Sequence, residues 1–164
     1  MLRPMIRLAV TLGSIVSLGA SAAPSEAAEC KVVRGHFEET LVTGPTCTSP
    51  VGLCTVAQML GALQGTAHFT ASAIIPSADT PTTSVVFVIG DTVIEGAKVA
   101  GRRGTLFVKN AAAFRTTGNG DLADVQTITG GTDDLSGATG SLRISGNFVG
   151  TSGSATYQGA VCLP

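Results

Sequence analysis

Histidines and acidic residues at strand spacing are the first candidates for chemistry in this chain. His36 and Glu38 lie two positions apart in one stretch of alternating character, and His68 lies in a second stretch. Residues two apart point to the same face of a strand, so an imidazole near a carboxylate could serve as acid or base inside a barrel. His36 and His68 are therefore candidate ligand-binding residues. In the alternative arrangement Phe37 and Phe69 face the core and both histidines face solvent. The two arrangements exclude each other, and the alternation favours the second.

Glu39 is the exception to this pattern, because it shares the face of Phe37 and would lie among apolar residues near a strand end. Burial would raise the pKa of its carboxyl by desolvation. Arg115, next to Phe114, could neutralise Glu39. Glu39 and Arg115 are therefore the candidate catalytic residues.

Other reactive patterns predict neither a metal nor a cofactor. Asp133 and Asp134 share one glycine-rich turn, but a repeat-type calcium site needs further aspartates at a fixed period. Arg102 and Arg103 lie between glycines as a charged hairpin tip, without the strand and helix of a phosphate-binding loop. A GxSxG nucleophile motif is missing from the sequence.

The sequence contains four cysteines, Cys30, Cys47, Cys54 and Cys162. An even number of cysteines in an oxidising compartment predicts disulfides. Four cysteines allow three connectivities. Cys47 and Cys54 flank a short loop and pair easily, which leaves Cys30 for Cys162, at the two ends of the mature chain. Zinc is the rival, but neither CxxC spacing nor clustered histidines support it.

The first residues have the pattern of a secretory signal peptide. Arg3 and Arg7 precede an apolar run over 8–18 and a small-residue site, Ala20-Ser21-Ala22. The pattern predicts a signal peptide over 1–22, with cleavage after Ala27 as the alternative. The apolar run is shorter than the roughly 20 residues that span a bilayer. We expect a protein secreted to the extracellular space or periplasm, without a membrane span.

The mature chain, 23–164, has the size of one domain. Both arginines of the signal are lost and all 11 acids stay, so the net charge falls from −1 to 8 − 11 = −3. A mildly acidic chain without a basic stripe argues against nucleic acid as a partner. Its many glycines, threonines, serines and valines and its lack of tryptophan are typical of an all-β domain.

Alternating stretches separated by glycine- and proline-rich turns predict about eight strands, at the spacing of a sandwich or barrel. We expect a loop over 75–83 and turns at 90–91, 96–104, 118–120 and 150–153. The expected strands are 31–42, 53–60, 63–72, 85–89, 92–95, 105–109 with 111–117 as its continuation or a separate piece, 122–129, 142–149 and 154–162. The run over 85–89 is apolar on both faces, which fits a strand covered by a subunit or by a loop.

The segment 129–148, TGGTDDLSGATGSLRISGNF, carries a resemblance to known families. It resembles the GG-[TS]-G-x-[FL]-x-x-[AG]-x-G turn of allene oxide cyclases and plant dirigent proteins, with Leu135, Ala138 and Gly140 matching and Asp133 in place of a glycine. Secreted bacterial proteins with an allene-oxide-cyclase-like barrel are more similar still, through SPVGLCT, GALQGTAHFT, DTPTTSVVFVIGD and AFRTTGNGDLADVQTITGGTDDLSGATG.

The resemblance implies an all-β fold, an eight-stranded antiparallel up-and-down barrel of the allene oxide cyclase or calycin type. No position matches the catalytic residues of the cyclases or the acidic pocket residues of dirigent proteins. We expect a non-catalytic module that holds a small apolar ligand in the barrel. The alternatives are an isomerase or cyclase acting on an apolar substrate, and a structural protein with a filled barrel. Related barrels often form trimers through an apolar outer surface, so a homotrimer is an expected assembly.

Overall fold

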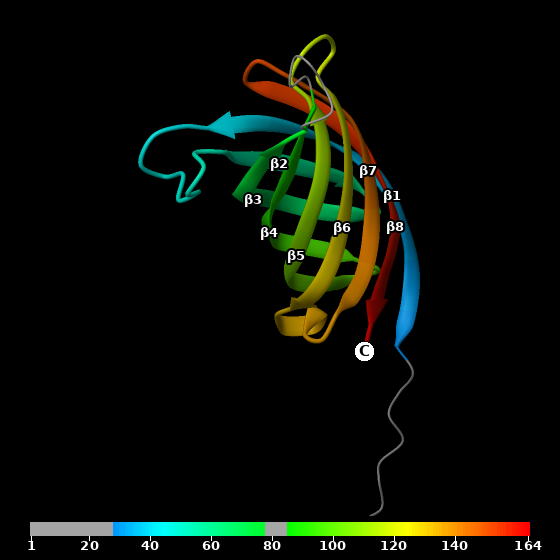
Figure 1. Ribbon diagram of the computed structural model, residues 1–164. Coiled ribbons are helices and arrows are strands. Elements are labelled where there is room, and N and C mark those ends of the chain that lie inside the picture. Colours follow the sequence, from blue (N-terminus) through cyan, green and yellow to red (C-terminus); the bar gives the residue numbers. More distant parts are fainter. Residues whose placement is uncertain (1–27, 78–84) are drawn as a thin grey trace, which may run out of the picture.

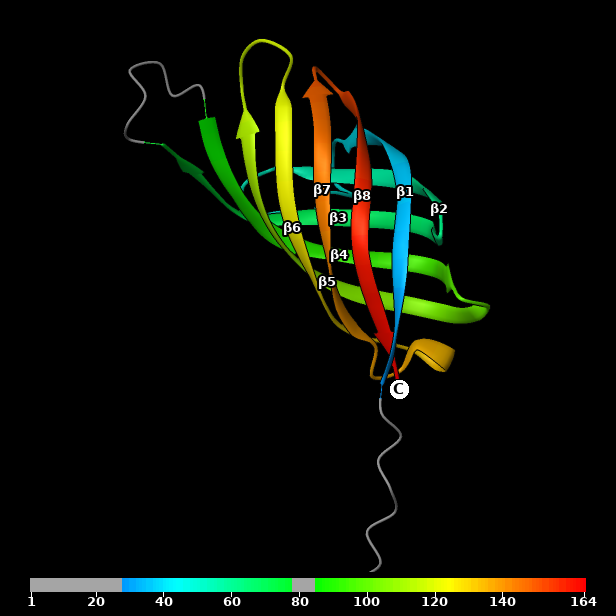
Figure 2. The same cartoon turned by 90° about the vertical axis from the view of Figure 1, so that its right-hand side faces the viewer.

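The computed structural model describes residues 28–77 and 85–164 and contains eight antiparallel strands that close into a barrel. Each strand pairs with the next along the chain, and β8 pairs with β1 (Figures 1 and 2). The predicted up-and-down barrel is therefore confirmed. The strands are β1 (Glu29–Val42), β2 (Cys54–Gly61), β3 (Leu63–Pro76), β4 (Val85–Val99), β5 (Arg102–Arg115), β6 (Asp121–Gly131), β7 (Thr139–Val149) and β8 (Ser152–Leu163), and a short 3-10 helix, η1 (Asp133–Leu135), joins β6 to β7.

The two ends of the barrel differ. The loops 43–53 and 116–120 and the turn at 150–151 lie at one end, which we call the open end. The turns at residue 62 and at 100–101, together with the corner that contains η1, lie at the other, which we call the closed end. The C-terminus lies at the closed end, near the first residues of β1 (Figure 1).

Alternation of side chains places one face of each strand in the barrel interior, as the sequence predicts. In β1, Val33 and Phe37 are buried, while Arg34 and His36 are exposed. In β7, Leu142 and Ile144 are buried, and Arg143 between them is exposed. The interior is therefore lined by every second residue of each strand.

The predicted break of the fourth strand is wrong. Residues 85–89 and 92–95 do not form a hairpin around Gly90, because β4 runs without interruption from Val85 to Val99. Gly90 pairs with Ala71 on β3 and Asn110 on β5. A Cβ atom on Gly90 would lie 2.5 Å from the ring of Phe69. The glycine therefore makes room for an aromatic ring on the neighbouring strand instead of forming a turn.

The predicted turn over 96–104 is also wrong, because the reversal occupies only Ala100 and Gly101. These residues have φ angles of 50° and 83°, as a two-residue hairpin with positive φ at both positions requires. Gly96, with a φ of 59°, lies at a register shift between Ile94 and Ala97. It marks a β-bulge within the strand, a place that often takes a glycine with positive φ.

Two smaller differences concern strand limits. Residues 75 and 76, predicted as loop, belong to β3, where Ile75 pairs with Phe87 and Pro76 with Val86. The rest of the predicted loop lies mostly outside the described residues. Residues 105–117, predicted as one or two pieces, form the single strand β5 up to Arg115. The strands are therefore longer than their apolar patterns suggest.

Apolar side chains fill the closed end of the barrel. Leu63, Leu106, Leu135 and Leu142 have no exposed surface. Leu135 of η1 reaches this core from the glycine-rich corner and fixes the corner to the barrel. The core also contains Val33, Val99, Ala138, Val161 and Leu163.

Tyr157 on β8 adds a polar connection to this apolar core. Its hydroxyl accepts a hydrogen bond from the Leu63 amide at 3.0 Å and lies 2.7 Å from the Leu63 carbonyl oxygen and 3.1 Å from that of Leu60. The phenol therefore joins β8 to the turn between β2 and β3 from inside the barrel. The hydroxyl has a single proton, which it can donate to the carbonyl oxygen of either Leu63 or Leu60.

Two disulfides crosslink the chain, and their connectivity is the predicted one. Cys30 pairs with Cys162 across β1 and β8 at the closed end, and Cys47 pairs with Cys54 across the loop before β2. No cysteine among the described residues is free. The predicted signal peptide, 1–22, lies outside the described residues. Within the described ranges no helix is long and apolar enough to cross a membrane.

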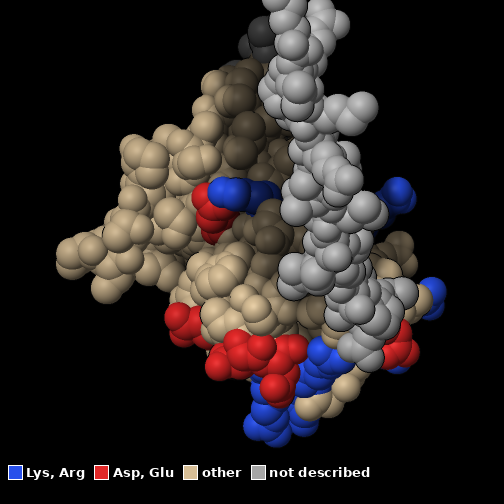
Figure 3. Space-filling view, turned by 90° about the horizontal axis from the view of Figure 1, so that it is seen from below, with Lys and Arg blue, Asp and Glu red and all other residues tan. Residues whose placement is uncertain are grey.

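Charged side chains are unevenly spread over the surface. Seen from the closed end, acidic and basic side chains lie next to each other, beside a broad region without charge (Figure 3). Three of the acids on the outer surface are paired with Lys or Arg: Glu29 with Lys31, Asp91 with Lys109, and Asp121 with Arg115. The loop 43–53 contains no charged residue.

Candidate functional site

A cavity of about 410 Å3 occupies the open half of the barrel. All strands contribute to its wall except β8, and the loop at 116–120 and Gly150 border its mouth. Most of the wall is apolar and includes Leu41, Ala57, Met59, Ala67, Val88, Ala112, Leu122 and Ile144. The barrel is thus filled at one end and hollow at the other.

Two carboxyl groups face this apolar cavity, one from β1 and one from β6. Glu39 accepts a hydrogen bond from the Thr55 hydroxyl on β2. Asp124 is 8% exposed. Both positions follow from strand alternation, because Glu39 is two residues from buried Phe37, and Asp124 is four residues from buried Ile128.

Asp124 has the more extensive hydrogen-bond support. Its Oδ2 accepts bonds from Asn110 Nδ2 at 2.9 Å and Gln126 Nε2 at 3.0 Å, and its Oδ1 accepts one from the Ala111 amide at 3.1 Å. Asn110 is fixed in turn, because its Oδ1 accepts a bond from the Thr92 hydroxyl at 2.9 Å. The polar side chains of β4, β5 and β6 therefore form one network that ends on this carboxylate.

Burial dominates the electrostatics of both acids. Desolvation raises the pKa of Glu39, the nearby charge of Asp124 raises it further, and the hydrogen bond from Thr55 opposes the increase. Desolvation also raises the pKa of Asp124, against the hydrogen bonds from Gln126 and Asn110 and from backbone amides. Asp124 accepts hydrogen bonds from two side-chain amides and two backbone amides, whereas Glu39 accepts one from a hydroxyl. The two acids are therefore unequal, and Asp124 is better prepared to hold a negative charge.

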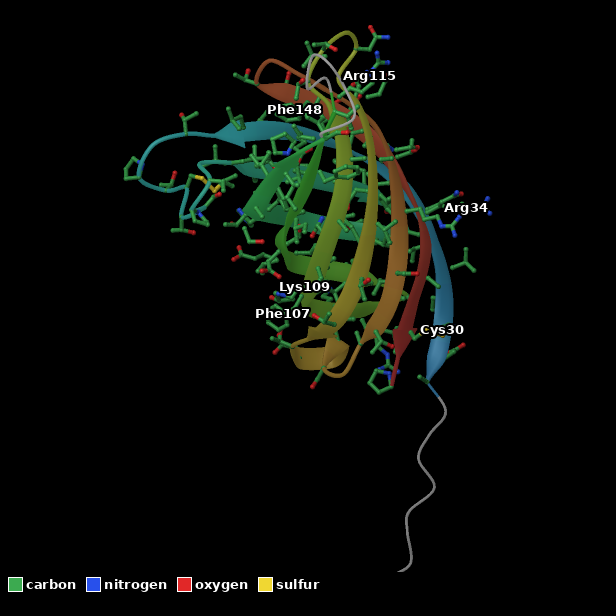
Figure 4. All side chains as sticks on the ribbon, in the orientation of Figure 1. Cys30, Arg34, Phe107, Lys109, Arg115 and Phe148 are labelled. Atoms are coloured by element: carbon green, nitrogen blue, oxygen red, sulfur yellow. A yellow bond between two sulfur atoms is a disulfide. The ribbon has the colours of Figure 1, made fainter. Side chains whose placement is uncertain are left out.

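The structure brings together only part of the predicted site. Glu39 lies in the cavity, as its place beside Phe37 indicates. His36 and His68 are exposed on the outside of the barrel and do not line the cavity, and His68 Nε2 lies 3.6 Å from Glu95 Oε2. Arg115 does not contact Glu39, because it is exposed at the rim, where its Nη1 lies 3.0 Å from Asp121 Oδ2 (Figure 4).

The acidic turn and the arginine pair lie at the closed end, away from the cavity. Asp133 accepts a hydrogen bond from the Thr132 hydroxyl at 2.8 Å, and Asp134 lies 3.4 Å from the Arg103 amide. Arg102 donates to the carbonyl oxygen of Pro164 at 3.0 Å. Among the described residues, no group of three or more His, Cys, Asp or Glu side chains could hold a metal ion.

Sequence reasoning missed most of the polar wall: Thr55, Thr92, Asn110, Asp124 and Gln126. The signal was present in β6, where Leu122, Asp124, Gln126 and Ile128 occupy one face and Val125 the other. Val125 is 55% exposed, so Asp124 and Gln126 on either side of it face the interior of the barrel. A strand whose core face carries an acid and an amide between two aliphatic residues points to a cavity.

The outer surface carries an apolar area on β3 to β6. Ile75, Phe87, Ile89 and Val125 are 45–55% exposed, and Phe107 is 41% exposed. Ile75 pairs with Phe87 across β3 and β4, and Ala111 connects Ile89 to Val125 across β4, β5 and β6. Phe107 and Lys109 lie on this side of the barrel (Figure 4). We call the residues Ile75, Phe87, Ile89, Phe107 and Val125 the apolar outer face.

Comparison with known proteins gives a distant structural neighbour. No protein-family model and no curated protein sequence matches the chain. Among solved structures, a pterocarpan synthase dirigent protein is similar over 90% of this chain and 99% of its own, with 13% sequence identity and a TM-score of 0.33. We transfer no residue role from a similarity at this level. The closed antiparallel barrel is evident from the strand pairing itself.

Proposed function

We propose that this chain is a secreted binding protein that holds a small, mostly apolar ligand in the cavity of its barrel. The cavity carries the proposal: at about 410 Å3 it lies within the range of 300–1,000 Å3 typical of small-molecule sites. Its wall is mainly aliphatic and aromatic with a few polar groups, as in such sites. Two disulfides are compatible with an extracellular location.

A filled barrel with a purely structural role fits the cavity less well. Packing the lumen with side chains would bury more apolar surface, and each buried CH2 contributes about 0.8 kcal/mol. The chain instead places alanines at Ala57, Ala67 and Ala112 where larger side chains would fill the space. Small side chains around a hollow support a binding role.

Native mass spectrometry of the protein purified from a host that secretes it tests the proposal. We expect a co-purified small molecule with the wild-type chain. Ala112→Phe adds a ring inside the cavity, so this variant should no longer retain the small molecule. Ala111→Phe makes the same change one residue earlier, where the side chain is exposed, and should retain the molecule. Equal retention by both variants would place the ligand outside the cavity.

An isomerase or cyclase is the second candidate, and the unequal carboxyls favour it. Glu39 could supply a proton while Asp124 stabilises positive charge across the same lumen, and an enclosed apolar site excludes water from reactive intermediates. Isomers share one mass, so the test is chromatography of the released molecule. A catalyst predicts a different isomer bound to Glu39→Gln than to the wild type, whereas a carrier predicts the same one.

We also propose that a second copy of this chain covers the apolar outer face. Asp91 and Lys109 form an ion pair on the strands that carry this face. In a symmetric assembly, Asp91 of one copy can therefore lie opposite Lys109 of another. A homotrimer is the assembly that the family resemblance suggests. Sedimentation velocity of the purified protein tests this proposal, and a monomer at all concentrations would contradict it.

A further inference from the structure

The polar groups of the cavity wall are directed to the two carboxyls, and this determines what a ligand meets there. Thr55 donates to Glu39, and Asn110 and Gln126 donate to Asp124. An ionised carboxyl has about four acceptor positions. One hydrogen bond reaches Glu39, whereas two side-chain amides and two backbone amides reach Asp124, so most of the acceptor positions that remain for a ligand are on Glu39. The wall therefore offers mainly hydrogen-bond acceptors.

The charge of the wall points the same way. Glu39 and Asp124 are the only titratable side chains among the described residues that line the cavity, and no Lys, Arg or His lies with them. The two like charges repel each other, and no Lys, Arg or His among the described residues of the wall offsets them. A positive charge placed between them would favour the ionised form of both groups.

Aromatic rings supply an independent observation. Phe37, Phe69, Phe114 and Phe148 all line the cavity, and the rings of Phe114 and Phe148 meet edge to face with centroids 6.3 Å apart. The face of a phenyl ring attracts an organic cation, more strongly when water is excluded. Phenylalanine has no polar atom, so these rings add attraction for a cation without adding a hydrogen-bond donor.

From acceptors, negative charge and aromatic faces in one enclosed space, we propose that the ligand is an organic cation, an amine or ammonium group on a small apolar body. Its charged nitrogen lies between Glu39 and Asp124, and its apolar part contacts the phenylalanines. This inference rests on the proposed ligand-binding function and adds the chemical class of the ligand. A metal ion fits less well, because calcium takes six to eight oxygen ligands and magnesium octahedral geometry, whereas the wall provides two carboxyls.

Three naphthalene derivatives of similar size test the inference: 1-naphthylmethylamine, 1-naphthylmethanol and 1-naphthoic acid. Binding of each to the purified, disulfide-bonded protein is measured by isothermal titration calorimetry at neutral pH. We expect the amine to bind at least about tenfold more tightly than the alcohol, a difference of about 1.4 kcal/mol. The acid should bind more weakly than the alcohol, because its carboxylate meets two others.

Two variants connect the preference to the cavity acids. Glu39→Gln should lower the affinity for the amine about tenfold and leave the affinity for the alcohol within a factor of two. Glu38→Gln removes the same charge from the adjacent, outward-facing residue and should change neither. For the wild type, affinity for the amine should rise with pH as Glu39 and Asp124 ionise, while affinity for the alcohol should stay flat.

The outcomes separate the two proposals. If alcohol and amine bind equally and Glu39→Gln has no effect, the cavity binds ligands but the inference about a cation is wrong. If calcium displaces the amine at equal concentration, a metal ion is the better occupant and the inference is again wrong. If no probe binds and the secreted protein carries no ligand, the proposed function fails with it.

Discussion

Replacing Glu39 with glutamine should stabilise the protein at neutral pH. Burial raises the pKa of Glu39 above its ordinary value of 4.5, because ionising this group costs more free energy in the folded protein than in the unfolded chain. Between pH 4.5 and the raised pKa, the folded state holds more protons at Glu39 than the unfolded state. The free energy of unfolding therefore falls as pH rises through this window, and stays level above it. Glutamine has the same size, keeps an acceptor for Thr55 and does not ionise.

The size of the effect follows from linkage. One group that binds a proton only in the folded state changes the free energy of unfolding by at most about 1.4 kcal/mol per pH unit. The difference between Glu39→Gln and the wild type should therefore grow from pH 4.5 upward with a slope no steeper than this, and level off above the raised pKa. Asp124 produces a slope of the same sign in both proteins, so most of its contribution cancels in the comparison.

Urea unfolding followed by far-UV circular dichroism measures this, because the chain contains no tryptophan. Glu38→Gln is the matched control: it removes one exposed carboxyl from the same strand, and its difference from the wild type should stay nearly constant with pH. The reasoning is refuted if Glu39→Gln is less stable than the wild type at neutral pH, or if its difference is as flat as that of the control. Lower stability would mean that the folded protein stabilises Glu39 as an anion, and a flat difference would mean that its pKa is the same in the folded and unfolded states.

Three further substitutions test the fold and the assembly. Tyr157→Phe should lower the free energy of unfolding by about 2–4 kcal/mol in urea titrations, because it leaves the buried amide and carbonyl of Leu63 without their partner; a loss below about 0.5 kcal/mol would show that water replaces the hydroxyl. Removing the Cys30–Cys162 disulfide, which joins residues 132 apart, by a double change to alanine should cost about 2–5 kcal/mol, and an unchanged urea midpoint would contradict this. Phe87→Asp in the apolar outer face should shift the sedimentation coefficient to that of a monomer, whereas Val32→Asp, an exposed site on β1, should not; equal behaviour would place the subunit contact elsewhere.

The fold was predictable where alternation alone decides it. β1 and β7 show it, since each places its apolar residues at every second position and its exposed residues between them. The two largest errors, at Gly90 and over 96–104, concern glycine. A glycine at position 90 predicts a turn, but the ring of Phe69 on the neighbouring strand is what explains why that position lacks a side chain. A sequence pattern contains the glycine but not the neighbour that requires it.

The candidate site was predictable only in part, for a related reason. Glu39 could be found because it interrupts the apolar face of a single strand. Asp124 is supported by Asn110 on one neighbouring strand, and its charge acts on Glu39 from across the lumen. Pairing the strands in register brings these residues together, and the sequence reveals neither the register nor the closure of the barrel. The histidines failed as candidates because the same alternation that buries Phe37 turns His36 outward.

The division of the barrel into a filled and a hollow half explains how it can carry two buried acids. A barrel of eight strands has an interior just wide enough to be filled by side chains or to hold one small ligand, and this chain does each at a different end. Apolar packing around Leu135 and the hydrogen bonds of Tyr157 hold the strands together at the closed end. Stability that comes from one end leaves the other free to keep small side chains, an open lumen and the unfavourable burial of Glu39 and Asp124. Such a cost is tolerated where charge and space serve a ligand, so the position of the acids, in the hollow half alone, is itself an argument for binding.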